Sequence, residues 1–501
     1  MGKKLNSNLF FAITVSLLVF FPGTGSAQTV ETAFIHWNDF HAYNQYKVTS
    51  DGDTVGGYAY LAAYRDSLEA LHPGNSFSLH AGDDFQGTPI STFTKGASQI
   101  QILNLVQPEA FVLGNHEFDY GRQNLDSLLR IAAFPTLAAN LLDIRTGKTF
   151  APPTTMLRGK SAQIGVIGLV PPNLYGLTLP ENVEDLKVLD QTAVVKEYVK
   201  SLESQVDLTV VLSHMGFSKD SLLATSLGSN TTVDLIVGGH SHTTLRHPRE
   251  VNGIPILQAG DHGQYLGHAV TNIDTVKNRI VSLNYELIPI DRSGVVPNPA
   301  VQSLVDSFTT EAKEELDEVI ATLKTPWKRE YDAESNIGNW QADVMRDYAD
   351  ADIAFQNSGG IRKDLPAGPV KVRDIWEINP FGNHFVRFEV TGADLQTILK
   401  HQITDPKEFL QLSGLQYTWD KSERRFTRAL VDRKNIDETV NYSIVTNNYV
   451  FSHFEDFFGF PQSTISAVKH LPDIDRDVFL RAAARQDTID SRVQIRAEIV
   501  K

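Results

Sequence analysis

Leu113-Gly114-Asn115-His116-Glu117-Phe118-Asp119-Tyr120-Gly121 is the stretch on which the fold and the chemistry of this chain depend. Five consecutive residues within it supply an amide, an imidazole and two carboxylates, and the apolar run 110–113 leads directly into them. A strand that ends in a glycine and places polar side chains in the next loop is typical of an α/β protein with chemistry at the carboxyl edge of its sheet. The stretch therefore predicts an α/β domain with a functional site at a strand end.

Four other β-rich runs in the same half of the chain also end in residue types that bind metals. Any one of these residues alone is more often structural, for example as an N-cap or an Asx turn. Together they indicate a shared site. The seven candidate ligands are Asp39, His41, Asp83, Asn115, His214, His240 and His242.

Three of the seven candidates suggest how the metal ions are arranged. Asp39 and His41 are two residues apart, and alternate residues of an extended segment point the same way, so we expect them to bind one ion together. A carboxylate can bridge two cations, so we expect Asp83 to join two adjacent metal sites.

The composition limits the possible partners and ligands. The 501 residues are 42% hydrophobic and 21% charged, which indicates a globular protein of about two domains. The formal charge of −15 argues against nucleic-acid polymers and anionic membranes as partners, although a small anion could bind through metals and a few arginines. The chain contains no cysteine, so any metal must be bound by nitrogen and oxygen ligands.

Residues 1–27 have the pattern of an export signal. Lys3 and Lys4 precede the apolar run 9–21, and Gly25-Ser26-Ala27 provides small residues before a cleavage point. The apolar run is shorter than the roughly 20 residues that a membrane span needs. No hydrophobic tail is seen at the other end of the sequence, so we expect a soluble, unanchored protein in the periplasm or outside the cell.

Strands and helices alternate through the first half of the sequence and predict a layered α/β domain over residues 28–295. Residues 296–324 contain the amphipathic pattern of a long helix, expected from Ala300 to Leu323, that connects this domain to the next. Residues 325–501 form a second domain with its own strand and helix signals, including a tight polar loop at 357–362.

The motifs resemble those of a known family. The order Asp-x-His, Gly-Asp, Gly-Asn-His-Glu-Phe-Asp, Ser-His and Gly-Gly-His-Ser-His is similar to that of the calcineurin-like metallophosphoesterases. The motifs at 335–339, 357–362 and 379–383 resemble the substrate domain of secreted 5'-nucleotidases. The resemblance implies a layered β-sandwich domain with flanking helices, joined by a long helix to a smaller α/β substrate-binding domain.

The resemblance also implies roles for individual residues. Asp83 would belong to both metal sites, one completed by Asp39, His41 and His242 and the other by Asn115, His214 and His240. The family often has Gln where His242 stands, and both residues can bind a metal. The resemblance implies two divalent ions, which could be Zn²⁺, Mn²⁺ or similar. His116 would act near the leaving oxygen, and Asp119 would orient it. The residues expected to bind substrate are Arg362, Asn383, Phe409 and Tyr449.

Simpler interpretations of the substrate residues stay open. Arg362 could be an ordinary surface ion-pair residue, and Phe409 and Tyr449 could be core aromatics. The family usually has a Gly-Gly-Asp-Gly turn after its second stacking aromatic, whereas this chain continues 450–456 without one. Tyr449 can replace that aromatic, but the ribose-binding Asp has no equivalent. His80, His262 and His268 lack ligand spacing, and we expect them to be structural.

The combined prediction is an exported phosphoester hydrolase with two divalent metal ions that converts nucleoside 5'-monophosphates or related nucleotides to nucleoside and phosphate. The alternatives within the enzyme class are a UDP-sugar pyrophosphohydrolase, a 2',3'-cyclic-nucleotide phosphodiesterase and a sulfur-oxidation hydrolase. From a different class, the chain could be a nucleotide-binding protein without turnover. The His116 and Asp119 pair argues against the last, because a binding protein does not need a leaving-group acid.

Overall fold

The structure, a computed structural model, describes residues 29–48, 54–178, 180–227, 232–292 and 294–500. The expected export signal at 1–27 lies outside these residues. Within the described ranges no helix combines the length and the apolar character needed to cross a membrane.

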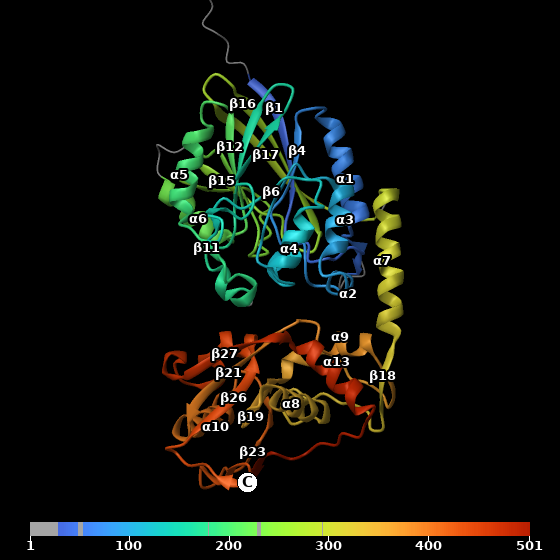
Figure 1. Ribbon diagram of the computed structural model, residues 1–501, viewed down its shortest axis with the longest axis vertical. Helices are drawn as coiled ribbons and strands as arrows, with labels where there is room; N and C mark the ends of the chain where they lie inside the picture. The colour runs from blue at the N-terminus through green and yellow to red at the C-terminus, as the bar shows by residue number, and fades with distance from the viewer. Residues whose placement is uncertain (1–28, 49–53, 179, 228–231, 293, 501) are drawn as a thin grey trace, which may run out of the picture.

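Two six-stranded sheets form the first half of the molecule, and a shared core fills the space between them (Figure 1). Phe34, Val112, Val166 and Val210 are among the fully buried side chains of this core. The first sheet has the order β17-β16-β1-β4-β5-β6 and the second the order β14-β15-β13-β12-β10-β9. The predicted layered sandwich is confirmed.

The strand bounds follow the sheet order. The first sheet contains β1 (Thr29–Trp37), β4 (Ser76–His80), β5 (Ala110–Val112), β6 (Thr136–Leu137), β16 (Tyr265–Asp274) and β17 (Arg279–Pro289). The second contains β9 (Thr154–Arg158), β10 (Gln163–Leu169), β12 (Leu208–Ser213), β13 (Leu235–Gly238), β14 (Arg249–Val251) and β15 (Ile254–Leu257). Shorter strands are β2 (Lys47–Val48), β3 (Thr54–Val55), β7 (Leu141–Asp143), β8 (Lys148–Thr149) and β11 (Leu186–Val188).

Helices cover the outer faces of both sheets. They are α1 (Tyr58–Leu71), α2 (Pro89–Phe93), α3 (Ala97–Val106), α4 (Arg122–Leu129), α5 (Gln191–Leu202) and α6 (Phe217–Leu227). Short 3₁₀ helices are η1 (His116–Phe118), η2 (Leu174–Gly176) and η3 (Pro180–Asn182). The helix expected at 58–71 is confirmed, and its apolar side chains join the core cluster on the outer face of the first sheet.

The strands that carry the predicted ligands run in parallel within each sheet. β1, β4 and β5 are parallel neighbours in the first sheet, and β12 and β13 are parallel neighbours in the second. Because the two sheets face each other, the loops after all five strands meet at one edge of the sandwich. At that edge the backbone N of Asp39 donates to the carbonyl of Gly82, 2.9 Å away.

The connecting helix is shorter than expected. α7 spans Pro299–Asp317, whereas the pattern predicted a helix to Leu323, and Val319–Leu323 instead forms strand β18. β18 pairs with β20 (Gly368–Lys371) and β28 (Thr488–Ile489), both distant in sequence. The β-branched Val319 and Ile320 favour an extended backbone, and these two partners provide its hydrogen bonds.

The second half of the molecule is a separate α/β unit around a five-stranded sheet of order β22-β19-β26-β21-β27. Its strands are β19 (Ile353–Asn357), β21 (His384–Thr391), β22 (Leu410–Ser413), β26 (Asn441–Asn447) and β27 (Ser466–Ile474). A four-stranded sheet contains β23 (Leu415–Asp420), β24 (Arg425–Val431), β25 (Lys434–Asn435) and β29 (Ala497–Val500). The helices are α8 (Asn336–Ala349), α9 (Val372–Ile378), α10 (Gly392–Thr404), α11 (Asn448–Ser452), α12 (Phe454–Phe458), α13 (Asp475–Gln486), η4 (Ser358–Gly360) and η5 (Gln462–Thr464).

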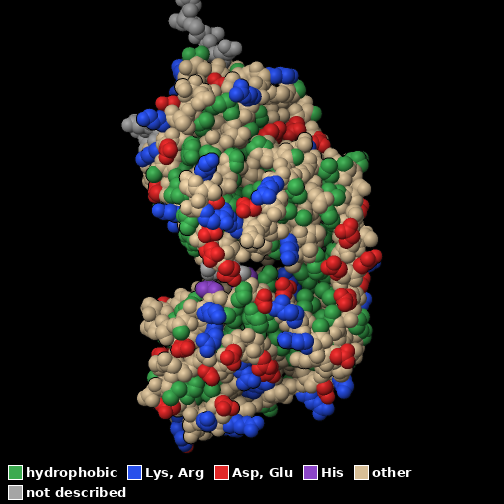
Figure 2. Space-filling model, viewed as in Figure 1, with side chains coloured by type: hydrophobic (Ala, Val, Ile, Leu, Met, Phe, Trp, Pro, Cys, Tyr) green, Lys and Arg blue, Asp and Glu red, His purple; other side chains and the backbone are tan. Residues whose placement is uncertain are grey.

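α7 runs along the first half of the molecule, and β18 continues from it along the second half (Figure 1). The space-filling view shows a cleft between the two halves as a notch with histidine side chains at its inner edge (Figure 2). At the base of α7, Asp317 forms ion pairs with Lys371 at 3.0 Å and with Arg373 at 2.9 Å. Across the cleft, the rings of Phe93 in α2 and Trp376 in α9 meet edge to face with centroids 5.9 Å apart.

Candidate metal centre and active site

The loops at the carboxyl edge of the sandwich bring six of the predicted ligands into overlapping groups. In each group the ligand atoms lie within 4.8 Å of one another. The groups are Asp39 with His41 and His242, Asp83 with His214 and His240, and His41 with Asp83 and His116. His41 and Asp83 therefore connect the two ends of one continuous cluster.

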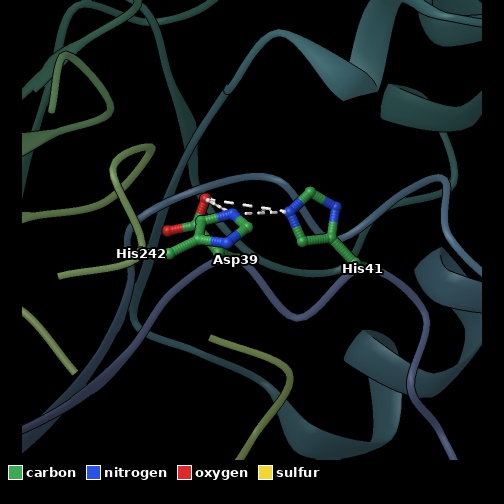
Figure 3. Close-up of side chains that lie close together, drawn as sticks. All are labelled: Asp39, His41 and His242. Carbon is green, nitrogen blue, oxygen red and sulfur yellow. Dashed lines mark hydrogen bonds and ion pairs between the residues drawn. The ribbon is translucent and has the colours of Figure 1, made fainter. Parts of the chain in front are cut away.

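The first group combines one carboxylate and two imidazoles from two strand ends (Figure 3). The Nε2 atoms of His41 and His242 are 3.1 Å apart, and each faces Asp39 Oδ1, at 3.9 Å and 3.4 Å respectively. Nδ1 of His242 is 3.0 Å from a carboxylate oxygen of Asp261. Asp261 thus fixes the orientation of the His242 ring, as outer carboxylates do for metal-binding histidines.

The second group is centred on Asp83. Nε2 of His214 is 2.9 Å from Asp83 Oδ2, and the backbone N of His116 donates to Asp83 Oδ1 at 2.9 Å. Nδ1 of His214 lies 2.5 Å from the carbonyl oxygen of Ala81, which leaves Nε2 directed at the cluster. His240 joins the group through its own ring, 5.2 Å from that of His214 between centroids.

The donor atoms suit divalent cations. Oδ1 of Asn115 is buried and has no hydrogen-bond partner among the described residues, as expected for an oxygen that binds a metal. Burial lowers the pKa of His41 to about 3 and that of His240 to about 4, whereas the neighbouring carboxylates raise the pKa of His214 to about 9 and that of His242 to about 10. Neutral imidazole is the form that binds metals.

The backbone around the ligands is strained in a way that the sequence did not indicate. We expected Asp39 and His41 to share a face of an extended segment, but β1 ends at Trp37 and both residues have φ near +50°. Asp83, His240 and His242 also have positive φ values. Left-handed backbone is costly for residues with a Cβ and is concentrated at functional sites.

Glu117 is a positioning residue that the sequence analysis did not single out. Its buried carboxylate accepts hydrogen bonds from four backbone N–H groups, those of Asp83 at 3.1 Å, Asp84 at 2.8 Å, Phe85 at 3.2 Å and Gly114 at 2.7 Å. It therefore fixes the loop after β4 against the loop after β5. Glu117 lies inside the Gly-Asn-His-Glu motif, so the motif itself could have indicated that this residue belongs to the site.

His116 and Asp119 form the expected pair. His116 Nδ1 is 2.6 Å from Asp119 Oδ2, and the His116 side chain is 28% exposed on the cleft side. Burial lowers the pKa of His116, but the carboxylates of Asp119 and Asp83 outweigh this effect and raise it to about 10. Nδ1 is engaged by Asp119, so Nε2 is the ring nitrogen that can donate a proton elsewhere.

The predicted substrate residues do not gather in the same way. Arg362 is exposed, donates to the carbonyl of Gly359 at 3.3 Å and lies 5.8 Å from the ring centroid of Phe381. The rings that contact Tyr449 belong to His453 and Phe457 rather than to Phe409.

Among the described residues, the hydrogen bonds and ring contacts of Arg362, Phe409 and Tyr449 are all with residues of the second half of the molecule. The carbonyl of Asn383 accepts a 2.7 Å hydrogen bond from the backbone N of Asp475, so this residue is part of the β21–α13 junction.

Two of the three histidines set aside as structural lie away from the cluster. His80 is fully buried and 3.0 Å from Asp84, and His268 is 3.3 Å from Glu286. His262 is different, because its ring centroid lies 5.6 Å from that of His41 and 5.8 Å from that of His242. Sequence spacing could not reveal this neighbour, since His262 follows β15 and not a strand that carries a ligand motif.

Comparison with known proteins shows two family matches in succession. Residues 32–244 match the family model described as calcineurin-like phosphoesterase, and residues 319–461 match that described as 5'-nucleotidase, C-terminal domain. The second match begins at β18, the strand that follows α7.

Several known proteins are similar to this chain over most of its length. The chain is 28% identical to a 5'-nucleotidase of Diplobatis ommata over 87% of this chain and 84% of that protein. It is also 28% identical to the endonuclease YhcR of Bacillus subtilis over 85% of this chain, but spans only 37% of that longer protein. The crystal structure of a 5'-nucleotidase precursor from Thermus thermophilus has a TM-score of 0.65 and 26% identity, covering 94% of this chain and 100% of that one.

Proposed function

We propose that this chain, which belongs to the calcineurin-like metallophosphoesterases with a 5'-nucleotidase C-terminal domain and is a phosphoester hydrolase, releases phosphate from nucleoside 5'-monophosphates with two divalent metal ions. The observation that carries the proposal is the continuous ligand cluster around Asp83, with the His116–Asp119 pair beside it. The second domain and the relatives named 5'-nucleotidase support a nucleotide as substrate.

The ligand set divides into two sites that share Asp83. Asp39, His41 and His242 would complete one site, and Asn115, His214 and His240 the other. Two divalent cations bound there would offset the negative charge of a phosphate ester. They would also lower the pKa of a bound water molecule, so that hydroxide is available as the nucleophile at neutral pH. Asp261 and Glu117 keep the ligand loops in place through the contacts described above.

His116 would supply the proton that the leaving group needs. Its Nδ1 is occupied by Asp119, so Nε2 is the atom that would transfer a proton to the leaving oxygen. A positioned general acid of this kind contributes about 10²- to 10⁴-fold to the rate. The pairing with Asp119 keeps the ring protonated and fixes its orientation, because a carboxylate stabilises the charged imidazole.

The test of the reaction class is phosphate release by the purified protein with Mn²⁺, with Zn²⁺ and after chelation. The substrates are AMP, UMP, ADP, UDP-glucose, a 2',3'-cyclic nucleotide and an aryl phosphate. We expect metal-dependent release with a preference for the monophosphates. Equal rates after chelation would reject the metal centre, and activity on the aryl phosphate alone would reject a nucleotide as the substrate.

The role of His116 is tested separately. His116→Ala should reduce the rate on AMP by about 10²- to 10⁴-fold. The loss should be smaller for an aryl phosphate with an acidic leaving group, because such a leaving group departs without a proton. Equal losses on both substrates would contradict the role of His116 as the acid.

Export is also part of the proposal. It rests on the lysines, the apolar run and the small residues of 1–27, since the structure describes no residue before Thr29. N-terminal sequencing of the protein recovered from outside the cytoplasm should begin near Gln28, whereas a protein that keeps residues 1–27 would contradict processing.

A further inference from the structure

A cavity of about 440 Å³ lies where α7 approaches α9 of the second domain (Figure 1). Its walls are formed by residues 42–46, residues 88–90 and one face of α7, and Arg373 in α9 lines it as well. This volume falls within the range of about 300–1,000 Å³ that is typical of small-molecule sites. None of the seven predicted metal ligands, all of which the structure describes, lines this α7 cavity, so it is separate from the metal centre.

The helix wall of the α7 cavity follows from the periodicity of α7. Residues three or four positions apart share one face of a helix, and four such residues line the cavity. They are Thr309, Ala312, Lys313 and Leu316. Ala312 is buried and belongs to the core of the first domain, whereas Leu316, one turn later, is only partly buried. The core beneath α7 thus ends within one turn, and the apolar face of the helix continues along the cavity.

The opposite wall is a continuation of a metal-binding loop. Residues 42–46 come directly after His41, and the hydroxyl of Thr88 fixes them to α2 because it donates to the carbonyl of Ala42 at 2.8 Å. The ring of Tyr46, which is half exposed, also lines the cavity. An exposed ring of this kind offers an apolar face on which a planar aromatic ligand can stack.

Positive charge is in excess at the end of the cavity near α9. Lys313 and Arg373 line the cavity, and no Asp or Glu of the described residues does. Asp317 pairs with Arg373 at 2.9 Å and with Lys371 at 3.0 Å, so one carboxylate serves two cations. Within the described part of the chain, Lys313 has no carboxylate within 4.0 Å, and the buried Nε of Arg373 has no hydrogen-bond partner. This charge distribution favours an anionic ligand.

We propose that the α7 cavity binds a small aromatic molecule that carries one anionic group. The Tyr46 ring and the apolar face of α7 would contact the aromatic body, and Lys313 and Arg373 would bind the anion through charge-assisted hydrogen bonds. Such a molecule would contact both domains and the segment after His41 at the same time. Binding at this site does not depend on the proposed function and can be measured without turnover.

The test measures the binding of two fluorescent probes to the Mn²⁺-loaded full chain. Anilinonaphthalene sulfonate has an aromatic body and one anionic group, whereas N-phenylnaphthylamine has the same body without the charge. Leu316→Trp fills the cavity, and Lys313→Gln and Arg373→Gln each remove one charge. The matched control is Lys371→Gln, because Lys371 also pairs with Asp317 but does not line the cavity. Circular dichroism checks that each variant is folded.

We expect the sulfonate probe to bind the parent protein and to stay bound when inorganic phosphate is added in excess. Lys313→Gln and Arg373→Gln should each weaken sulfonate binding about five- to tenfold, because a charge-assisted hydrogen bond is lost. The same variants should change the affinity for the neutral probe by less than about twofold, since it carries no charge. Leu316→Trp should weaken the binding of both probes about tenfold or more, because the space is filled. Lys371→Gln should bind both probes like the parent protein.

Three results would overturn the proposal. Equal sulfonate affinity of the parent protein and folded Leu316→Trp would show that the probe binds elsewhere, and displacement by phosphate would place it at the metal centre. Equal losses in Lys371→Gln and Lys313→Gln would assign the effect to the general surface charge. Lys313 is exposed, so Lys313→Gln keeps the test decisive if Leu316→Trp does not fold.

The two proposals can fail independently. A parent protein that hydrolyses no nucleotide but binds the sulfonate probe as described would refute the proposed function and support the α7 cavity as a binding site. A parent protein that hydrolyses AMP, with sulfonate binding that no variant changes, would support the function and refute the site.

Discussion

The two sides of the cleft differ in how closely their predicted residues gather. On the metal side, six of the seven predicted ligands fall into overlapping groups, and the seventh, Asn115, is buried beside Asp83. On the substrate side, Arg362 is exposed and lies beside Phe381, and the rings that contact Tyr449 belong to His453 and Phe457. The ligands follow strand ends whose position the sheet fixes, whereas the substrate face depends on how two domains are placed.

Loss of the shared carboxylate should produce the largest effect. Asp83→Asn should weaken binding at both metal sites by more than the roughly 100-fold that loss of an outer-shell partner costs, because a ligand itself is changed. Phosphate release should fall with it. The measurements are metal content after gel filtration and release from AMP.

The control for this variant is Asp207→Asn. Asp207 accepts a 2.7 Å hydrogen bond from the backbone N of Gln163 at the opposite end of the strands. It should keep full metal content and activity. Two tightly bound metal ions in Asp83→Asn would contradict the role of Asp83 as the ligand that both metal sites share.

Glu117 should have the next largest effect. Glu117→Gln replaces one acceptor oxygen by an N–H₂ group that faces backbone N–H donors, so the Asp83 loop should shift and metal affinity should fall about 10- to 100-fold. Glu109→Gln is the control, because Glu109, directly before β5, accepts a 2.7 Å hydrogen bond from the backbone N of Ser78, near the start of β4 and away from the ligand loops. Equal effects of the two substitutions on metal affinity, measured by competition with a chelator, would argue against a specific role for Glu117.

The aromatic pair of the substrate side should have a smaller effect. Phe409→Ala and Tyr449→Ala should each raise KM for AMP about two- to tenfold, which corresponds to roughly 0.5–1.5 kcal/mol of ring contact. KM for an aryl phosphate should change less. Tyr331→Ala, the control, removes another exposed ring of the same domain and should change neither the KM for AMP nor the KM for an aryl phosphate. Unaltered KM values in both variants would assign Phe409 and Tyr449 to the fold.

A buried carboxyl beneath the metal loops affects stability rather than activity. Burial raises the pKa of Asp220 from 3.8 to about 7, and Ser213 Oγ donates to it at 2.5 Å. The folded state thus favours the protonated form, so the free energy of unfolding should fall as the pH rises from about 4 through 7. Asp220→Asn should flatten this dependence and raise Tm at pH 8 by about 2–4 °C.

The control for Asp220 is Asp306→Asn, on the exposed face of α7. Its pH profile of Tm should follow that of the parent protein. A parent Tm that rises between pH 4 and pH 7, with no difference in Asp220→Asn, would contradict the assigned cause.

Sequence motifs were sufficient for the fold class and for the placing of the ligand loops. Each ligand motif follows an apolar run, and parallel strands bring such loops to one edge whatever the length of chain between them. His214 and Asp39 are far apart in sequence, yet their side chains are 3.8 Å apart for this reason. Helix α1 was also predictable from its own sequence, because its apolar residues recur at helical spacing.

Features that depend on distant partners were not predictable. The pattern of Val319 and Ile320 fits a helix, and only the presence of β20 and β28 makes this segment a strand. The left-handed backbone of Asp39 and His41 follows from hydrogen bonds to the Gly82–Asp84 segment.

The central claim is that one ligand cluster binds two metal ions and that hydrolysis needs both. The direct measurement is a titration of the metal-free protein with Mn²⁺, with bound metal determined by elemental analysis and phosphate release from AMP measured at each point. We predict two ions per chain, with activity that rises as the second site fills. Full activity with one ion bound, or with none, would contradict the account.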